Sequence, residues 1–147
     1  MLQSQLLHPQ ILRALAGAGH GSKVLISDAN YPHSTQRGPS AELVFLNLAP
    51  GMVNVTDVLR ALLSAIPVEA AEVMAPLKTG PYAMAHDPDI FAEFSALLKS
   101  TDCRGELARL ERMAFYEAAR TPAVCLTIAT GERRIYANLL LTIGVVR

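Results

Sequence analysis

Hydrophobic runs and turn-forming residues alternate along the chain, and their spacing predicts a series of strands and helices. Largely apolar runs without a helical period, typical of buried strands, occupy residues 23–27, 43–46, 123–128 and 139–143. Apolar positions three or four residues apart, typical of amphipathic helices, occupy residues 9–16, 54–64, 87–98 and 113–120. A short strand is expected at residues 72–74, whereas residues 106–111 fit either a strand or a helix.

Residues typical of turns and caps separate these elements. Glycines end the first helix at residues 17–21, and Asn54 with Asp57 has the spacing of a helix capping box. A turn at Gly131 lies between the last two strands, which predicts a closing hairpin or a short crossover. Helices interspersed among apolar strands are typical of a layered α/β domain.

Composition narrows the classes of protein that fit this pattern. Residues 1–147 are expected to fold as a single domain, because domains usually have about 100–200 residues. Half of the chain is apolar (51%) and 18% is charged, which excludes a disordered polyelectrolyte. Thirteen basic residues balance thirteen acidic ones, so no nucleic-acid partner is expected. Zero net charge and an apolar-rich composition favour self-association, and we therefore expect a homo-oligomer.

Cysteine content and the N-terminal residues bear on the compartment. Cys103 and Cys125 are too few for a disulfide framework, and no spacing typical of zinc ligands occurs. The N-terminus lacks a basic start followed by an apolar run, and no run of about 18 apolar residues occurs. We expect a cytoplasmic protein with reduced thiols and no membrane partner.

Several common active-site motifs are missing from the sequence. The glycine-rich run at residues 17–21 follows a helix and lacks the spacing of a phosphate-binding loop. The four histidines include no pair spaced by four residues, and no Gly-x-Ser-x-Gly motif is present. The remaining candidates are groups that donate or accept hydrogen bonds and protons at the ends of elements.

His20 and Asp28 are the first such candidates. His20 precedes the first predicted strand and Asp28 follows it, so the length of the strand separates them. Within one chain they are not neighbours unless the loop folds back, whereas a neighbouring subunit can supply one of them. Each is equally compatible with an ordinary turn residue.

Two further pairs have the spacing of neighbours. Arg112 and Tyr116 are four residues apart, which places both side chains on one face of a helix, although an arginine covering a packed aromatic ring has the same pattern. Tyr136 and Asn138 are two residues apart, which predicts a shared strand face or an ordinary edge pair.

Four short blocks of sequence resemble the L-fucose mutarotase and D-ribose pyranase family, in order and spacing from near residue 7 to the end. The blocks are Gly19-His20-Gly21, Ser27-Asp28-Ala29-Asn30-Tyr31-Pro32, Arg112-Met113-Ala114-Phe115-Tyr116-Glu117, and Thr130-Gly131-Glu132 with Tyr136-Ala137-Asn138. The resemblance implies a mixed β-sheet flanked by helices, and ring-like homo-oligomers with sites between subunits. It also implies a neutral monosaccharide as substrate and no cofactor or metal.

The resemblance also implies roles for single residues. His20 corresponds to a proton donor and Tyr116 to a second catalytic group. Substrate contacts are implied for Asp28, Arg112, Tyr136 and Asn138, with Glu69 and Met74 as additional candidates. Glu69 stands where the animal members carry a catalytic aspartate.

The implied reaction is mutarotation, in which the sugar ring opens and closes again on the other face. It needs two proton-transfer groups, and an imidazole with an unperturbed pKa of about 6.5 suits this task near neutrality. L-Fucose is the favoured substrate. Two alternatives stay open: D-ribose pyranase activity, since Tyr136-Ala137-Asn138 matches the ribose branch, and sugar binding without turnover. Sugar binding without turnover is an alternative because this chain has Leu48-Ala49-Pro50-Gly51 where fucose mutarotases usually have Arg-Ala-Asp-Gly.

Overall fold

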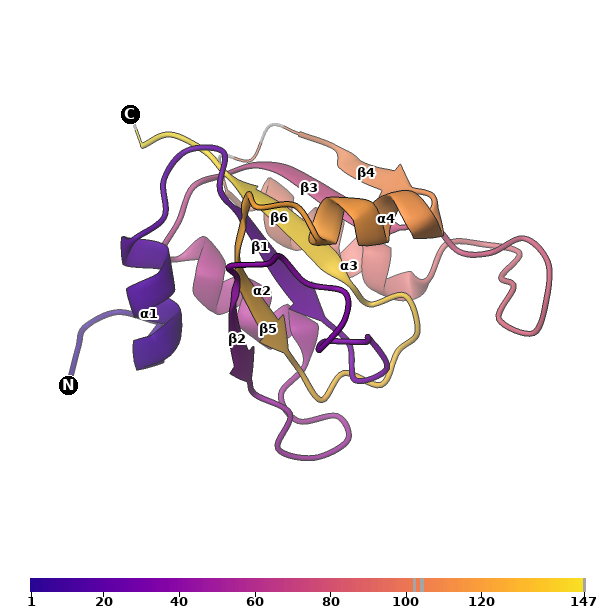
Figure 1. Ribbon diagram of the computed structural model, residues 1–147, viewed down its shortest axis with the longest axis horizontal. Coiled ribbons are helices and arrows are strands. Elements are labelled where there is room, and N and C mark those ends of the chain that lie inside the picture. Colours follow the sequence, from indigo (N-terminus) through magenta and orange to yellow (C-terminus); the bar gives the residue numbers. More distant parts are fainter. Residues whose placement is uncertain (102, 104, 147) are drawn as a thin grey trace.

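A six-stranded mixed sheet forms the centre of the protein, shown in Figure 1 as a computed structural model that describes residues 1–101, 103 and 105–146. The strands lie in the order β2-β5-β1-β6-β3-β4. Their bounds are β1 Lys23–Ser27, β2 Glu42–Phe45, β3 Val68–Met74, β4 Leu107–Leu110, β5 Val124–Ala129 and β6 Leu139–Ile143. Strand β6 runs antiparallel to its neighbours β1 and β3, whereas the other paired strands run parallel.

Four helices in the described part of the chain cover the sheet. They are α1 Pro9–Ala16, α2 Val55–Leu63, α3 Asp89–Lys99 and α4 Arg112–Ala119. In the view of Figure 1, α4 lies in front of the sheet, and α2 and α3 pack against each other behind it. Helix α1 packs against β5 and the outer strand β2. The observed fold confirms the predicted mixed sheet flanked by helices.

The core explains why the strands read as continuous apolar runs. Both faces of the central strands are covered, so residues 24–27 of β1 and 139–141 of β6 are fully buried, without the alternation of a half-exposed strand. Phe94 of α3 and Phe115 of α4 are also fully buried. Burial of each large apolar side chain contributes about 1.5–3 kcal/mol to the free energy of folding, relative to an exposed position.

Most predicted elements are confirmed with small shifts at their ends. Asn54 and Asp57 form the expected capping box, with the backbone N–H of Asn54 donating to Asp57 Oδ2 at 3.1 Å. The ambiguous segment at residues 106–111 contains strand β4, and strand β3 begins earlier than expected, at Val68. No helix among the described residues is long and apolar enough to cross a lipid bilayer.

The predicted closing hairpin between the last two strands is wrong, and the alternative, a short crossover, is correct. Strand β1 lies between β5 and β6, so residues 130–138 cross over the end of β1. This segment is held in place by hydrogen bonds to the residues around it. Thr130 Oγ1 donates to the carbonyl of Ser27 at 2.8 Å, and the N–H of Ala29 donates to the carbonyl of Glu132 at 2.9 Å.

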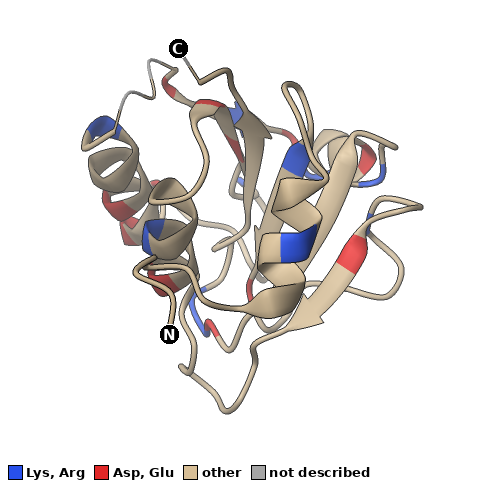
Figure 2. Ribbon diagram, turned by 90° about the vertical axis from the view of Figure 1, so that its left-hand side faces the viewer, with Lys and Arg blue, Asp and Glu red and all other residues tan. Residues whose placement is uncertain are grey.

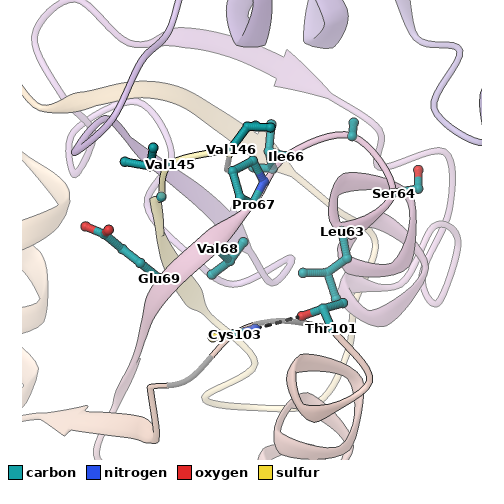
Figure 3. A pocket seen from close by; sticks show the side chains of 12 residues that line it. Leu63, Ser64, Ile66, Pro67, Val68, Glu69, Thr101, Cys103, Val145 and Val146 are labelled. Carbon is teal, nitrogen blue, oxygen red and sulfur yellow. Dashed lines mark hydrogen bonds between the residues drawn. The ribbon is translucent and has the colours of Figure 1, made fainter.

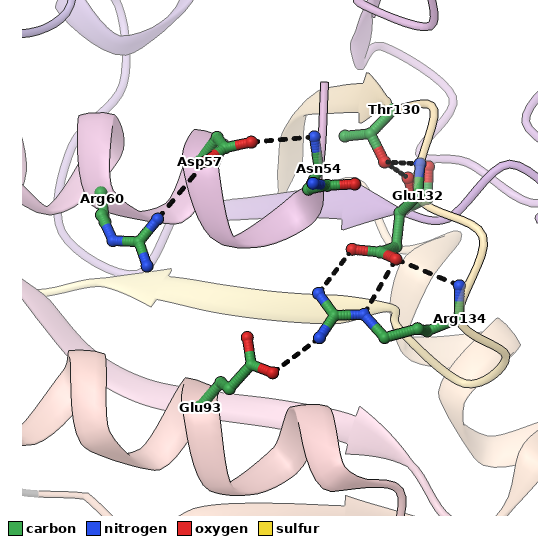
Figure 4. A network of polar contacts seen from close by, with 8 residues as sticks. Asn54, Asp57, Arg60, Glu93, Thr130, Glu132 and Arg134 are labelled. Carbon is green, nitrogen blue, oxygen red and sulfur yellow. Dashed lines mark hydrogen bonds and ion pairs between the residues drawn. The ribbon is translucent and has the colours of Figure 1, made fainter. Parts of the chain in front are cut away.

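A buried carboxylate organises the crossing segment (Figure 4). Glu132 is 2% exposed, and the guanidinium of Arg134 donates to both of its oxygens, at 3.0 and 2.9 Å. Arg134 also donates to Glu93 of α3 at 2.6 Å, which ties the segment to the helix behind the sheet. Burial by itself would raise the pKa of Glu132, but the hydrogen bonds from Arg134 outweigh it and lower this pKa.

Gly131 sits where two segments approach too closely for any side chain. A Cβ atom at this position would lie 2.2 Å from the carbonyl oxygen of Met52 and 2.3 Å from that of Ala49. Its N–H donates to the carbonyl of Val53 at 2.9 Å, and its carbonyl accepts from Gly51 at 2.6 Å. The turn at residues 49–52 is therefore packed directly on Gly131.

We expect Gly131→Ala to lower the free energy of unfolding by about 2–3 kcal/mol, because the new methyl group would force two backbone segments apart. Urea unfolding followed by circular dichroism measures this loss. Gly19→Ala is the matched control, since a Cβ at Gly19 meets nothing within 4 Å. Equal stability of the two variants would contradict the close packing at Gly131.

Candidate active site

The carboxyl ends of the parallel strands β1, β3 and β4 and the start of the antiparallel strand β6 meet at one edge of the sheet. Ligands of open α/β sheets bind at this edge. A cavity of about 270 Å³ opens there, close to the lower limit of ~300 Å³ for typical ligand pockets. The residues that line it are Asp28, Asn30, Tyr31, Met74, Tyr82, Arg112, Tyr116, Ile135, Tyr136 and Asn138.

Asp28 and Asn138 form a reciprocal pair at the base of this site. The N–H of Asp28 donates to Asn138 Oδ1, and Asn138 Nδ2 donates to Asp28 Oδ2, both at 2.9 Å. The N–H of Asn30 donates to the other carboxylate oxygen of Asp28, also at 2.9 Å. Burial raises the pKa of Asp28 to about 6, although these hydrogen bonds oppose the shift. Asp28 is thus a carboxyl group that titrates close to neutral pH.

Arg112 and Tyr116 share one face of helix α4, as predicted. The guanidinium carbon of Arg112 lies 5.7 Å from the centre of the Tyr116 ring, within the range of a cation–π contact. Tyr116 is half-buried, and its ring lies 5.8 Å from that of Tyr31. The Tyr31 hydroxyl donates to the carbonyl of Gln36 at 2.7 Å, and burial raises its pKa, so this phenol stays protonated. The cavity wall at α4 therefore combines one cation with aromatic rings.

Tyr136 and Asn138 line the same cavity, but the predicted shared strand face is wrong. Both precede strand β6, which begins at Leu139, and Tyr136 has a left-handed backbone with φ of 63°. The Tyr136 hydroxyl donates to the carbonyl of Tyr82 at 2.8 Å and accepts from the N–H of Leu77 at 3.1 Å. The two residues converge on the cavity because the crossing segment bends over the end of β1.

His20 and Glu69 lie at the amino ends of β1 and β3, here called the amino edge of the sheet, and they do not line this cavity. His20 precedes β1, Asp28 follows it, and β1 spans roughly 17 Å at the usual rise per residue. His20 Nε2 lies 3.0 and 3.1 Å from the two carboxylate oxygens of Glu69, and both side chains are exposed. Within one chain, the histidine and Asp28 are therefore at opposite ends of β1, as the sequence predicted.

A second cavity, of about 650 Å³, lies beside Glu69 (Figure 3). Its wall includes the turn at Pro67, the side chain of Thr101, and Val145 and Val146 near the chain end. Among the described residues that line it, apolar side chains predominate and Glu69 is the carboxylate. The described residues around this cavity carry fewer hydrogen-bonding side chains than those around Asp28, which makes the carboxyl-edge cavity the stronger candidate for a ligand with several hydroxyl groups.

Four residues that line the carboxyl-edge cavity were not among the predicted site residues: Asn30, Tyr31, Tyr82 and Ile135. Asn30 belongs to the block that follows β1, and its backbone is part of the Asp28 network. Tyr82 follows Pro81 in an exposed loop. The sequence feature that could have pointed to it is an isolated aromatic residue in a predicted loop. Met74, an additional candidate, does line the cavity at the end of β3.

The charge distribution favours an uncharged ligand. Basic and acidic positions are interspersed over the helices and strands of the described chain (Figure 2). At the cavity, Arg112 and Asp28 are the residues of opposite charge among those that line it. Hydroxyl groups suit both, since a carboxylate accepts and a guanidinium donates hydrogen bonds.

Comparison with known proteins agrees with the resemblance of the sequence blocks. Residues 1–146 match the family described as the RbsD / FucU transport protein family. The human fucose mutarotase is 31% identical over 146 residues, which cover 95% of this chain and 90% of the human protein.

Two solved structures share the fold and carry sugars. The fucose mutarotase of Streptococcus pneumoniae in complex with L-fucose has a TM-score of 0.78 and 26% identity, over 95% of this chain and 94% of that one. RbsD of Bacillus subtilis complexed with D-ribose has a TM-score of 0.77 and 26% identity, with 100% of both chains covered. The chain belongs to the RbsD/FucU family.

Proposed function

We propose that this protein is a mutarotase that interconverts the anomers of L-fucose by general acid–base catalysis. The observation that carries this proposal is the cavity at the carboxyl edge. It brings Asp28, Asn138, Arg112 and Tyr116 together in a chain related to fucose mutarotases along nearly its whole length. The cavity is small and its lining mixes hydrogen-bonding groups with aromatic rings, which suits a single sugar ring.

The proposed reaction moves two protons and leaves no net change in composition. A base takes the proton of the anomeric hydroxyl while an acid protonates the ring oxygen, and the bond between the anomeric carbon and the ring oxygen breaks. The open aldehyde rotates, and the ring oxygen attacks its other face as both protons return. Positioned acid–base groups typically contribute ~10²–10⁴-fold each.

The residues of the cavity have distinct roles in this proposal. Asp28 accepts hydrogen bonds from sugar hydroxyls, Asn138 fixes the orientation of Asp28, and Arg112 donates to a sugar oxygen. The Tyr116 hydroxyl relays one proton. It is suited to this because Arg112 lies against its ring, where a positive charge stabilises a developing phenolate.

The second proton-transfer group in the proposal is His20 of a neighbouring copy. His20 and Glu69 lie at the amino edge, so one copy would present them to the carboxyl-edge cavity of the next. Repeated head-to-tail contacts of this kind form a ring when the rotation from one copy to the next closes. Glu69 accepts from His20 Nε2, which leaves Nδ1 free for the substrate and makes Glu69 a positioning residue for the imidazole.

D-Ribose pyranase activity is the second candidate, because RbsD bound to D-ribose has the same fold at a similar level of identity. Exchange between anomer signals in NMR spectra separates the candidates. Faster exchange for L-fucose than for D-ribose supports the mutarotase proposal, and faster pyranose–furanose exchange of D-ribose supports the alternative. Binding of sugars with no acceleration of exchange would leave a sugar-binding protein without turnover.

Tyr116→Phe should lower the rate of anomer exchange by at least about tenfold, because the ring and its packing remain while the proton-relaying hydroxyl is lost. Saturation-transfer NMR on L-fucose measures the rate. Glu117→Gln, a change at the exposed neighbouring position of α4, is the control. A wild-type rate in Tyr116→Phe would mean that the Tyr116 hydroxyl takes no part in catalysis and that the ring serves in packing.

His20→Ala should abolish most of the exchange activity without unfolding the protein, since the side chain is exposed. Co-refolding equal amounts of His20→Ala and Tyr116→Phe chains should restore about a quarter of wild-type activity. The reason is that a quarter of randomly assembled head-to-tail sites combine two intact halves. No recovery in mixed oligomers would contradict a site shared between copies.

L-Fucose should bind more weakly as the pH falls through 6, because burial raises the pKa of Asp28 to about 6 and the protonated carboxyl loses an acceptor. The dissociation constant should rise about tenfold between pH 7 and pH 5 if only the ionised form binds. Titration by NMR in the His20→Ala background leaves Asp28 as the group under test. The same titration of Asp28→Asn should be weak and independent of pH, and an unchanged pH dependence there would exclude Asp28 as its source.

A further inference from the structure

The segment between β3 and α3 projects from the body of the protein. Arg109 of β4 holds the far end of this segment through Asp87, and the side chain of Tyr136 holds its turn. In Figure 1 this segment extends beyond the sheet at the right. The Tyr136 hydroxyl accepts from the N–H of Leu77 at 3.1 Å and donates to the carbonyl of Tyr82 at 2.8 Å. A single oxygen atom therefore holds both ends of the turn formed by residues 77–82.

These two bonds leave the Tyr136 hydroxyl little capacity for a ligand. A tyrosine hydroxyl has one hydrogen to donate and two lone pairs to accept with. Its hydrogen is committed to Tyr82 and one lone pair to Leu77, so no donor remains for a sugar oxygen. Tyr136 is also buried, with 8% of its surface exposed. A role in holding the turn accounts for both observations.

The backbone of Tyr136 points to the same role. Its φ of 63° lies in the left-handed region, which glycine and asparagine tolerate and which is uncommon for an aromatic residue. A tyrosine in this conformation is held by what its side chain contacts. Here those contacts are the two backbone groups of the projecting turn.

Tyr82 is the residue that this turn brings to the cavity. It lines the carboxyl-edge cavity while 63% of its surface is exposed, so it lies at the mouth. Ile135, which is 43% exposed, lines the same cavity next to Tyr136 in sequence. A ring at the mouth can pack on the C–H face of a sugar, a contact worth about threefold to tenfold in affinity.

We propose that Tyr136 is a positioning residue whose hydroxyl fixes residues 77–82 as the outer wall of the cavity, and that Tyr82 on this wall contacts the bound monosaccharide. This inference rests on the proposed sugar-binding role of the cavity. It assigns substrate affinity to a loop residue and removes the Tyr136 hydroxyl from direct contact with the sugar.

The test compares Tyr136→Phe, Tyr82→Ala and the double variant by two measurements. KM for anomer exchange of L-fucose should rise about threefold to tenfold in each single variant, with kcat changed less than KM. The double variant should lie within about twofold of either single one, because both changes remove the same contact. Full multiplication of the two effects would contradict the proposed coupling.

Limited trypsin digestion supplies a measurement that does not depend on activity. Lys78 is exposed within the turn, so cleavage after it should be faster in Tyr136→Phe, which loses both hydrogen bonds between the Tyr136 hydroxyl and the turn. Tyr82→Ala keeps its backbone carbonyl and should be cleaved at the wild-type rate. Tyr31→Phe, which also loses one tyrosine hydroxyl bond, is the control for general loosening and should not accelerate cleavage after Lys78.

The outcomes separate this inference from the proposed function. A wild-type protein that neither binds L-fucose nor accelerates its exchange contradicts the function, whereas the digestion pattern still tests the hold on the turn. Wild-type KM in both single variants contradicts the contact with the sugar. Unchanged cleavage after Lys78 in Tyr136→Phe contradicts the positioning role.

Discussion

The antiparallel placement of β6 between the parallel strands β1 and β3 is the constraint on which the site depends. A last strand parallel to its neighbours would begin at the amino edge, far from the residues that end β1. Because β6 runs the other way, the segment before it must cross the carboxyl edge. The Asp28–Asn138 pair then joins the end of one strand to the start of the other and builds the base of the cavity.

The electrostatics of the cavity follow from this construction. Asp28 is buried because the crossing segment covers it, and the same segment supplies the amide of Asn138 that stabilises its ionised form. Burial outweighs the hydrogen bonds and raises the pKa of this carboxyl group to about 6. Such a group accepts hydrogen bonds from hydroxyls when ionised, and a single arginine at the wall balances its charge.

Local sequence patterns were sufficient to predict the helices and strands. They were insufficient to predict how these elements are arranged in the sheet and around the cavity. The four-residue spacing of Arg112 and Tyr116 correctly predicted a shared helix face, because helical geometry depends only on neighbours in sequence. The left-handed backbone of Tyr136 and its bonds to Leu77 and Tyr82 depend on residues more than fifty positions away. The hairpin prediction failed for the same reason, since nothing local to residues 130–138 indicates that β1 lies between the flanking strands.

The two outermost strands, β2 and β4, limit how further chains can attach to the sheet. Each is four residues long, which leaves a short row of unpaired backbone groups. Glu42 of β2 is engaged by Arg13, and Arg109 of β4 by Asp87, so charged side chains flank both margins. Continuation of the sheet into another molecule is therefore discouraged on both sides. A protein with zero net charge and an apolar-rich composition is thus protected from fibre-like stacking, while the ends of its strands remain open to contact.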